Sequence, residues 1–221
     1  MATFPKLCAA LVVAGEAVVL AQSLSLGMTG GLRAADDFQY AATSESRRYV
    51  VGPTATLALP LGFAIEFEAL YRRQGYSTGN GTPFYTSSIR EADNIWEFPL
   101  LARYRIPFAR VRPFVEAGWA PRITNGSADS SGCSFDFNTG SYYCAGGRRH
   151  TSWPTTHGAV VGGGVQFAAG RLEFPPEIRY THWNQQNIYG YFGDGPSYGS
   201  TQNQLDILLG ISLRLAGRAA K

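Results

Sequence analysis

The sequence predicts an all-β chain that folds as a closed antiparallel transmembrane β-barrel of about eight strands with up-and-down topology. Three observations predict this fold: a low content of charge, connections that alternate between short and long, and strands that separate apolar from charged residues. Only 16% of the 221 residues are charged, whereas about a quarter is usual in soluble domains. The 26 glycines, 12 tyrosines and 13 phenylalanines are typical of aromatic strands joined by many turns.

The N-terminus has the pattern of a secretory signal. Lys6 supplies a positive charge, Leu7 to Leu20 is apolar, and Ala21 ends a cleavage pattern of small residues. We therefore expect a signal peptide at 1–21 and a barrel domain at 22–221; the alternative is a buried N-terminal helix. After Ala21 no run of about 18 apolar residues follows, so the sequence offers no transmembrane helix. A membrane protein with this sequence would have to be a barrel.

Eight segments have the length and alternation of strands that cross a bilayer. They are Leu24 to Leu32, Arg48 to Leu59, Phe63 to Arg73, Asn94 to Ile106, Val111 to Arg122, His157 to Phe167, Arg171 to Trp183 and Gln204 to Leu215. Pro53, Pro99, Pro113, Pro175 and Pro176 fall inside these segments, where a closed barrel has no edge to hide them.

The predicted connections alternate in length. Tight turns are expected at residues 59–62, 107–110 and 168–170, and long polar loops at 33–47, 74–93, 123–156 and 184–203. Outer-membrane barrels join their strands with short periplasmic turns and longer extracellular loops.

Charged side chains share one side of the predicted strands, and only Arg73, at a strand end, departs from this pattern. An arginine facing lipid at mid-membrane costs roughly 2–4 kcal/mol, so the charged side must face the lumen. Buried charges must also pair with one another. The predicted lumen charge network consists of Glu66, Glu68, Arg72, Glu97, Arg103, Arg105, Arg112, Glu116, Glu177, Arg179, Asp206 and Arg214.

Two cysteines, Cys133 and Cys144, share one polar loop and would close a local disulfide in an oxidising compartment; two free thiols are the alternative. No spacing of residues predicts a catalytic, cofactor-binding or metal site. The net charge of +3, without a basic run, argues against nucleic acid as a partner.

With these features the chain resembles the small outer-membrane β-barrel proteins of the OmpA-transmembrane-domain and OmpX type. The clearest match is at the end, where Gly210, Leu213 and Leu215 fit the C-terminal strand pattern that the barrel-insertion machinery reads. Two departures are the leucines in place of a terminal aromatic residue and the extension beyond Leu215. The resemblance implies a bacterial outer-membrane protein that contacts lipid and the insertion machinery.

The predicted function is a non-enzymatic outer-membrane barrel with a structural or surface-interaction role. Tyrosines among Ser, Gly and Asn in the long loops favour contact with an extracellular ligand or surface. The alternatives are a narrow solute or ion pore, a lipid-modifying enzyme with His157 or His182 at the rim, and a soluble ligand-binding barrel with reversed facing.

Overall fold

The computed structural model describes residues 23–39, 43–106, 111–190 and 198–217. The predicted signal segment 1–21 and the predicted turn 107–110 lie outside these residues. The strands are β1 (Ser23–Arg33), β2 (Phe38–Gln39), β3 (Thr43–Ser44), β4 (Tyr49–Ala58), β5 (Phe63–Glu68), β6 (Leu70–Thr82), β7 (Tyr85–Glu97), β8 (Leu100–Arg105), β9 (Arg112–Asp136), β10 (Ser141–Ala169), β11 (Leu172–Phe174), β12 (Pro176–Trp183), β13 (Tyr189–Gly190), β14 (Tyr198–Ser200) and β15 (Asn203–Gly217). A 3-10 turn, η1 (Pro60–Gly62), joins β4 to β5 as a tight connection.

Twelve of the strands form one antiparallel sheet that curls into a barrel-like ring. Its order is β11-β10-β12-β15-β1-β4-β5-β8-β9-β7-β6-β3, and β10 also pairs with β9. Within the ring this extra ladder runs from Val160↔Gly118 to Gln166↔Arg112. It joins the part of the sheet that contains β10 to the part that contains β9. A separate three-stranded sheet consists of β13, β14 and β2.

The sheet contains twelve strands rather than about eight, because several predicted strands are interrupted. Pro99 falls between β7 and β8, and Pro175 falls between β11 and β12. Proline lacks an amide donor, but its carbonyl still accepts: Glu68 N donates to Pro99 O at 3.1 Å, and Gly210 N donates to Pro175 O at 3.1 Å. Opposite Pro53, the ladder of β4 passes from β5 to β6 at Ala69. The prolines therefore divide the strands without ending the sheet.

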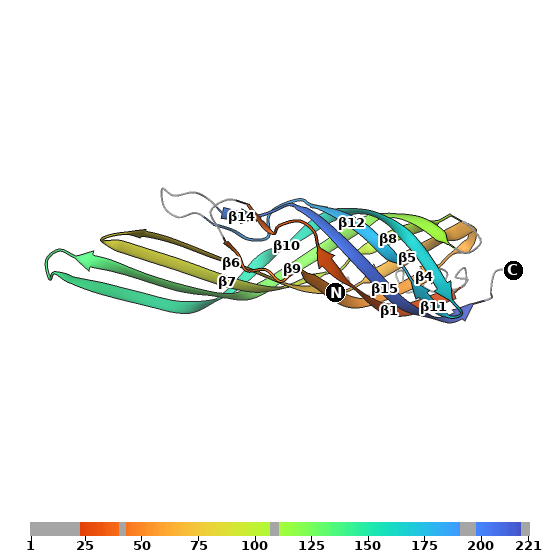
Figure 1. Cartoon of the computed structure of the whole chain (residues 1–221), viewed down its shortest axis with the longest axis horizontal. Coiled ribbons are helices and arrows are strands. Elements are labelled where there is room, and N and C mark those ends of the chain that lie inside the picture. Colours follow the sequence, from red (N-terminus) through yellow and green to blue (C-terminus); the bar gives the residue numbers. More distant parts are fainter. Residues whose placement is uncertain (1–22, 40–42, 107–110, 191–197, 218–221) are drawn as a thin grey trace, which may run out of the picture.

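Two of the predicted loops are strands. Residues 74–93 continue β6 and β7 as a hairpin, and residues 123–156 continue β9 and β10 as a longer one. β7 also pairs with β9 from Tyr85↔Ser134 onward, so the two hairpins form one sheet. We call its part beyond the ring, in β6, β7, β9 and β10, the projecting sheet. Figure 1 shows it extending from one end of the barrel.

Alternate residues of the ring face opposite environments. In β5 and in the described part of β15, exposed and buried residues alternate from one position to the next. The exposed apolar side chains form a band around the ring, which we call the apolar belt; it includes Leu26, Met28, Val51, Phe67, Leu100, Val115, Val161, Ile178, Ile207, Leu209 and Ile211. Large exposed apolar surfaces of this kind are rare on soluble monomers.

No helix in the described ranges is both long and apolar enough to cross a membrane.

Candidate functional site: the barrel interior and the projecting sheet

Two arginines and four glutamates fill the middle of the barrel. Nη2 of Arg103 donates to Glu66 at 2.8 Å, to Glu116 at 2.7 Å and to Glu177 at 2.9 Å. Arg179 contacts Glu116, with its Nε at 3.1 Å, and also Glu68 and Glu177. All six side chains are buried. We call Glu66, Glu68, Arg103, Glu116, Glu177 and Arg179 the central charge network.

Glycines make room for this network. A Cβ on Gly162 would approach Glu116 Oε1 to 2.8 Å, and one on Gly164 would lie 2.2 Å from the carbonyl oxygen of Pro176. The Gly162–Gly164 run is therefore a place where β10 packs closely against charged neighbours rather than a phosphate-binding loop.

Three carboxylates of this network come close enough to hold a metal ion. One oxygen each of Glu66, Glu116 and Glu177 lies within 4.8 Å of the others. The Arg103 guanidinium donates to all three, and it stands 4.0 Å from the centre of the Phe114 ring. The position between the carboxylates is therefore occupied by the protein's own cation.

A second charge network lies closer to the projecting sheet. Arg72 bridges Glu97 at 2.9 Å and Asp37 at 3.0 Å, while Arg33 contacts Asp37 and Asp206. Asp37 comes from the segment between β1 and β2, outside every predicted strand. Sequence alternation therefore could not identify it as a member.

The remaining residues of the predicted network lie at the opposite end. Arg214 pairs with Glu173 and keeps 27% of its side chain exposed. Arg105 is half-buried, and its Nε has no hydrogen-bond partner among the described residues. Arg112 corrects the prediction: it is exposed and forms no ion pair with a described residue. It starts β9, where the inner side of the strand already meets solvent.

Loop residues cover the mouth of the barrel below the projecting sheet. Asn187 Nδ2 donates to Gln74 Oε1 and to Thr124 Oγ1, both at 3.2 Å. Ile188 is fully buried against Tyr76. The cavity around the central charge network measures about 10 Å³, which is room for about one water molecule. Within the residues that the structure describes, the barrel interior is therefore filled by side chains.

Two buried carboxylates lie together at the base of the projecting sheet. Tyr76 Oη and Trp153 Nε1 donate to Glu91 at 2.8 and 2.9 Å, and Thr151 Oγ1 donates to Asp93 at 2.8 Å. Burial, reinforced by the neighbouring Glu91 carboxylate, raises the pKa of Asp93 to about 7. Asp93 can therefore change its charge near neutral pH.

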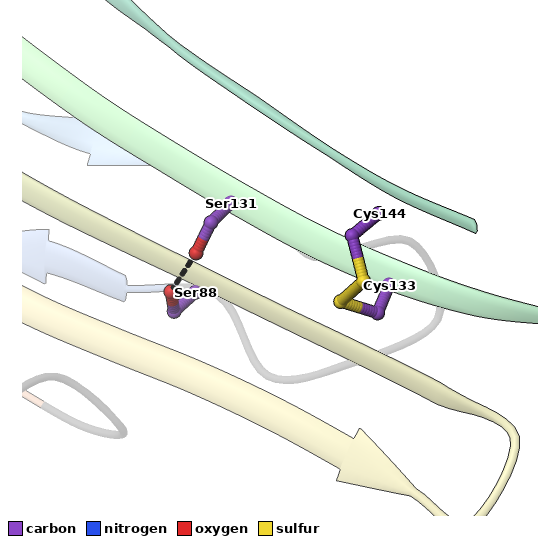
Figure 2. Close-up of a disulfide and its surroundings, with 4 residues drawn as sticks. All are labelled: Ser88, Ser131, Cys133 and Cys144. Carbon is purple, nitrogen blue, oxygen red and sulfur yellow. Dashed lines mark hydrogen bonds between the residues drawn. A yellow bond between two sulfur atoms is a disulfide. The ribbon is translucent and has the colours of Figure 1, made fainter. Parts of the chain in front are cut away.

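The projecting sheet is joined by a disulfide and a hydroxyl contact. Cys133 of β9 and Cys144 of β10 are direct partners in the ladder and are bonded to each other. Figure 2 shows this bond beside the hydrogen bond between Ser88 Oγ and Ser131 Oγ, 2.8 Å long, which links β7 to β9. The three strands are thus cross-linked by side chains as well as by backbone hydrogen bonds.

Aromatic side chains gather at the far end of the projecting sheet. The Phe84 ring lies 5.2 Å from that of Phe137, and Phe135 lies 5.1 Å from both Phe137 and Tyr142. Phe84, Phe137 and Tyr142 are 52%, 73% and 60% exposed. We call these four residues the apical aromatic cluster. Tyr191 and Phe192, also aromatic residues of a predicted loop, lie outside the described residues.

The three histidines of the chain, His157 and His182 of the predicted rim among them, have structural contacts. His157 stacks on Trp119 with ring centres 5.1 Å apart, and His182 Nδ1 lies 2.9 Å from Asn203 Oδ1. His150 Nδ1 lies 2.7 Å from the Gly126 carbonyl oxygen. No ion pair joins any of them to a carboxylate within the described ranges, so no acid–base pair is assembled there.

No protein-family model matches the chain, and no curated protein matches it either. Solved structures do. Neisserial surface protein A (NspA) is 12% identical, covers 88% of this chain and 98% of its own, and gives a TM-score of 0.50. The N-terminal β-barrel domain of Pseudomonas aeruginosa OprF is 12% identical over 88% and 98%, with a TM-score of 0.38. Ail, the attachment invasion locus protein of Yersinia pestis, is 11% identical over 87% and 97%, with a TM-score of 0.37. The ring, its apolar exterior and the likeness to NspA give the chain the fold of the small outer-membrane β-barrel proteins.

Proposed function

We propose that the chain is a non-enzymatic integral protein of the bacterial outer membrane, exported through residues 1–21, whose barrel anchors a surface-contacting sheet. The barrel is proposed to be closed and to cross the membrane with eight segments: β1, β4, β5 with the start of β6, the end of β7 with β8, β9, β10, β11 with β12, and β15. The apolar belt would meet lipid, and Gly210, Leu213 and Leu215 would direct insertion.

The observation that carries this proposal is the apical aromatic cluster at the end of a braced sheet. From Ile123 to Asp136, β9 extends roughly 40 Å at about 3.3 Å per residue. Exposed aromatic side chains lose little conformational entropy on binding and supply large contact areas. In a membrane, a sheet of this reach would hold them well beyond the lipid headgroups, where a ligand or a second surface is accessible.

The interior supports an anchor rather than a pore. The central charge network occupies the lumen, Ile188 helps to cover its mouth, and the cavity of about 10 Å³ admits no solute. Barrels of about eight strands have interiors that side chains can fill. In planar bilayers the protein should therefore give low conductance, and a steady large-channel current would refute the anchor role.

The surface-contact role is tested with the full chain held in nanodiscs and an array of immobilised glycans and proteins. Phe84→Ser combined with Phe137→Ser removes two exposed rings of the apical aromatic cluster. Leu61→Ser is the matched control, since Leu61 is 87% exposed at the opposite end of the barrel. We expect the wild-type chain and the Leu61 variant to bind the same partners on the array. The Phe84 and Phe137 double variant should lose them. Identical binding by all three proteins would overturn the proposal.

A further inference from the structure

A basic cleft lies on the outward face of the projecting sheet, next to the barrel. It has a volume of about 310 Å³. Its charged lining residues on the exposed face come from the segment before β4 and from four strands. These are Glu45, Arg47, Arg73, Arg90, Asp129 and Arg148. Of these six residues, only Arg73 stands out in the sequence, as the one charge on the apolar side of a predicted strand.

The cleft carries an excess of positive charge. Arg90 Nε contacts Glu45 Oε2 at 2.6 Å, and Arg148 Nε contacts Asp129 Oδ1 at 2.9 Å. The other two arginines, Arg47 and Arg73, are exposed and form no side-chain ion pair or hydrogen bond with a described residue.

A seventh charged residue, Glu91, also lines the cleft, but its carboxylate is buried and binds Tyr76 and Trp153. Four guanidinium groups thus face two accessible carboxylates, which leaves two positive charges available to a ligand.

The two arginines without an ion-pair partner among the described residues lie at the same height along the barrel axis. Arg47 N donates to Arg73 O at 3.0 Å, so the two residues are neighbours across the edge of the sheet. Arg73 follows Tyr71 by two positions on the same side of β6, which separates them by roughly 7 Å. Tyr71 packs on Trp96 with ring centres 5.3 Å apart, and together they end the apolar belt at this strand.

That level matches the position of lipid headgroups. Aromatic residues gather at the border between hydrocarbon and water, and the polar layer beyond the hydrocarbon is about 5–7 Å thick on each side. Guanidinium groups match phosphate oxygens in geometry and charge. With the apolar belt placed in a bilayer as proposed above, Arg47 and Arg73 lie where the phosphates of the surrounding lipid must be.

We propose that this cleft binds the phosphate groups of phosphorylated lipids in the leaflet that borders the projecting sheet. A lipid is the expected source of phosphate because its acyl chains would lie along the apolar belt directly beneath the cleft. A free phosphate would gain only the contacts with the arginines.

The test titrates the folded full chain in zwitterionic micelles with short-chain phosphatidic acid, short-chain phosphatidylcholine and inorganic phosphate, followed by calorimetry. The wild-type chain should prefer phosphatidic acid. Arg47→Ala with Arg73→Ala should weaken that binding roughly 30-fold, from about fivefold for each arginine at a membrane surface. Arg112→Ala, which removes an exposed arginine at the other end, is the control and should change nothing. Heat-modifiable gel mobility verifies that each variant is folded.

A second variant tests the charge argument with the opposite sign. Glu45→Gln removes a carboxylate from the cleft and should tighten phosphatidic acid binding several-fold. Equal affinity for inorganic phosphate and phosphatidic acid would overturn the lipid assignment. Unchanged binding in the Arg47 and Arg73 variant, or weaker binding in the Glu45 variant, would overturn the site. Planar-bilayer conductance and the array assay do not depend on phosphate binding, so failure of the proposed anchor role is recognised separately.

Discussion

Replacement of Arg103 by Met tests whether the central charge network holds the barrel together. Met retains an apolar stem beside Phe114 but leaves Glu66, Glu116 and Glu177 without the donor that now lies 2.7–2.9 Å from each. A hydrogen bond to a charged group contributes about 1.5–3 kcal/mol, but three bonds from one nitrogen are not additive. Removal of one partner of a buried ion pair costs about 3–5 kcal/mol. We therefore expect the free energy of unfolding to fall by about 3–5 kcal/mol.

Urea titration of the protein in lipid vesicles, followed by tryptophan fluorescence, measures this loss. With a slope of about 2 kcal/mol per molar urea, the midpoint should fall by about 2 M. Arg112→Met makes the same chemical change at an exposed position and should alter stability by no more than about 0.5 kcal/mol. Adding Glu66→Gln to the Arg103 variant should restore part of the loss, because one uncompensated carboxylate disappears. Equal midpoints for the Arg103 and Arg112 variants would refute the reasoning.

Three further predictions concern other parts of the molecule. Replacing Cys133 and Cys144 by Ser should lower the local stability at the far end of the projecting sheet by about 2–3 kcal/mol. Hydrogen exchange should rise there alone, and a shifted unfolding midpoint of the barrel would contradict this local role. The raised pKa of Asp93 favours its protonated form in the folded chain, so its contribution to stability is complete below about pH 4 and is lost as the pH rises through about 7. Hydrogen exchange near Asp93, corrected for intrinsic rates, should therefore increase from pH 5 to pH 8. In the Asp93→Asn variant this increase should be absent. Gly164→Ala should destabilise the barrel by about 1–3 kcal/mol because its Cβ would overlap the backbone of β12, and a wild-type midpoint would show that the two strands can separate.

The sequence predicts the ring well because one of its sides is apolar. In β15, Ile207, Leu209 and Ile211 face out, and Asp206 and Leu208 face in, as a period of two residues requires. The same physical constraint predicts the inward direction of charged residues in the middle of strands. It does not predict an ion pair at Arg112, because a strand end at the rim has solvent on both sides and this side chain is exposed.

Alternation could not reveal the projecting sheet. Beyond Ser127 in β9 most side chains are exposed or half-exposed, so no face of the sheet selects apolar residues. Ser, Gly and Asn there have the composition of loops although the backbone is paired throughout. The Cys133 and Cys144 pair was the one local sign that two segments lie side by side. The burial of Asp37 and Asn187 depends on how loops fold back over the mouth, which the sequence around each residue does not encode.

Because side chains on both faces of the projecting sheet are exposed to solvent, this sheet can accept more substitutions during evolution than the barrel can. A substitution in a solvated strand usually alters stability by no more than about 0.5 kcal/mol, whereas one added methyl group at Gly164 meets backbone. Mutations near Phe84 or Tyr142 are therefore tolerated by the scaffold, and selection at this end can act on what the protein touches. The barrel is held to a narrow set of residues, while the projecting sheet is free to diversify.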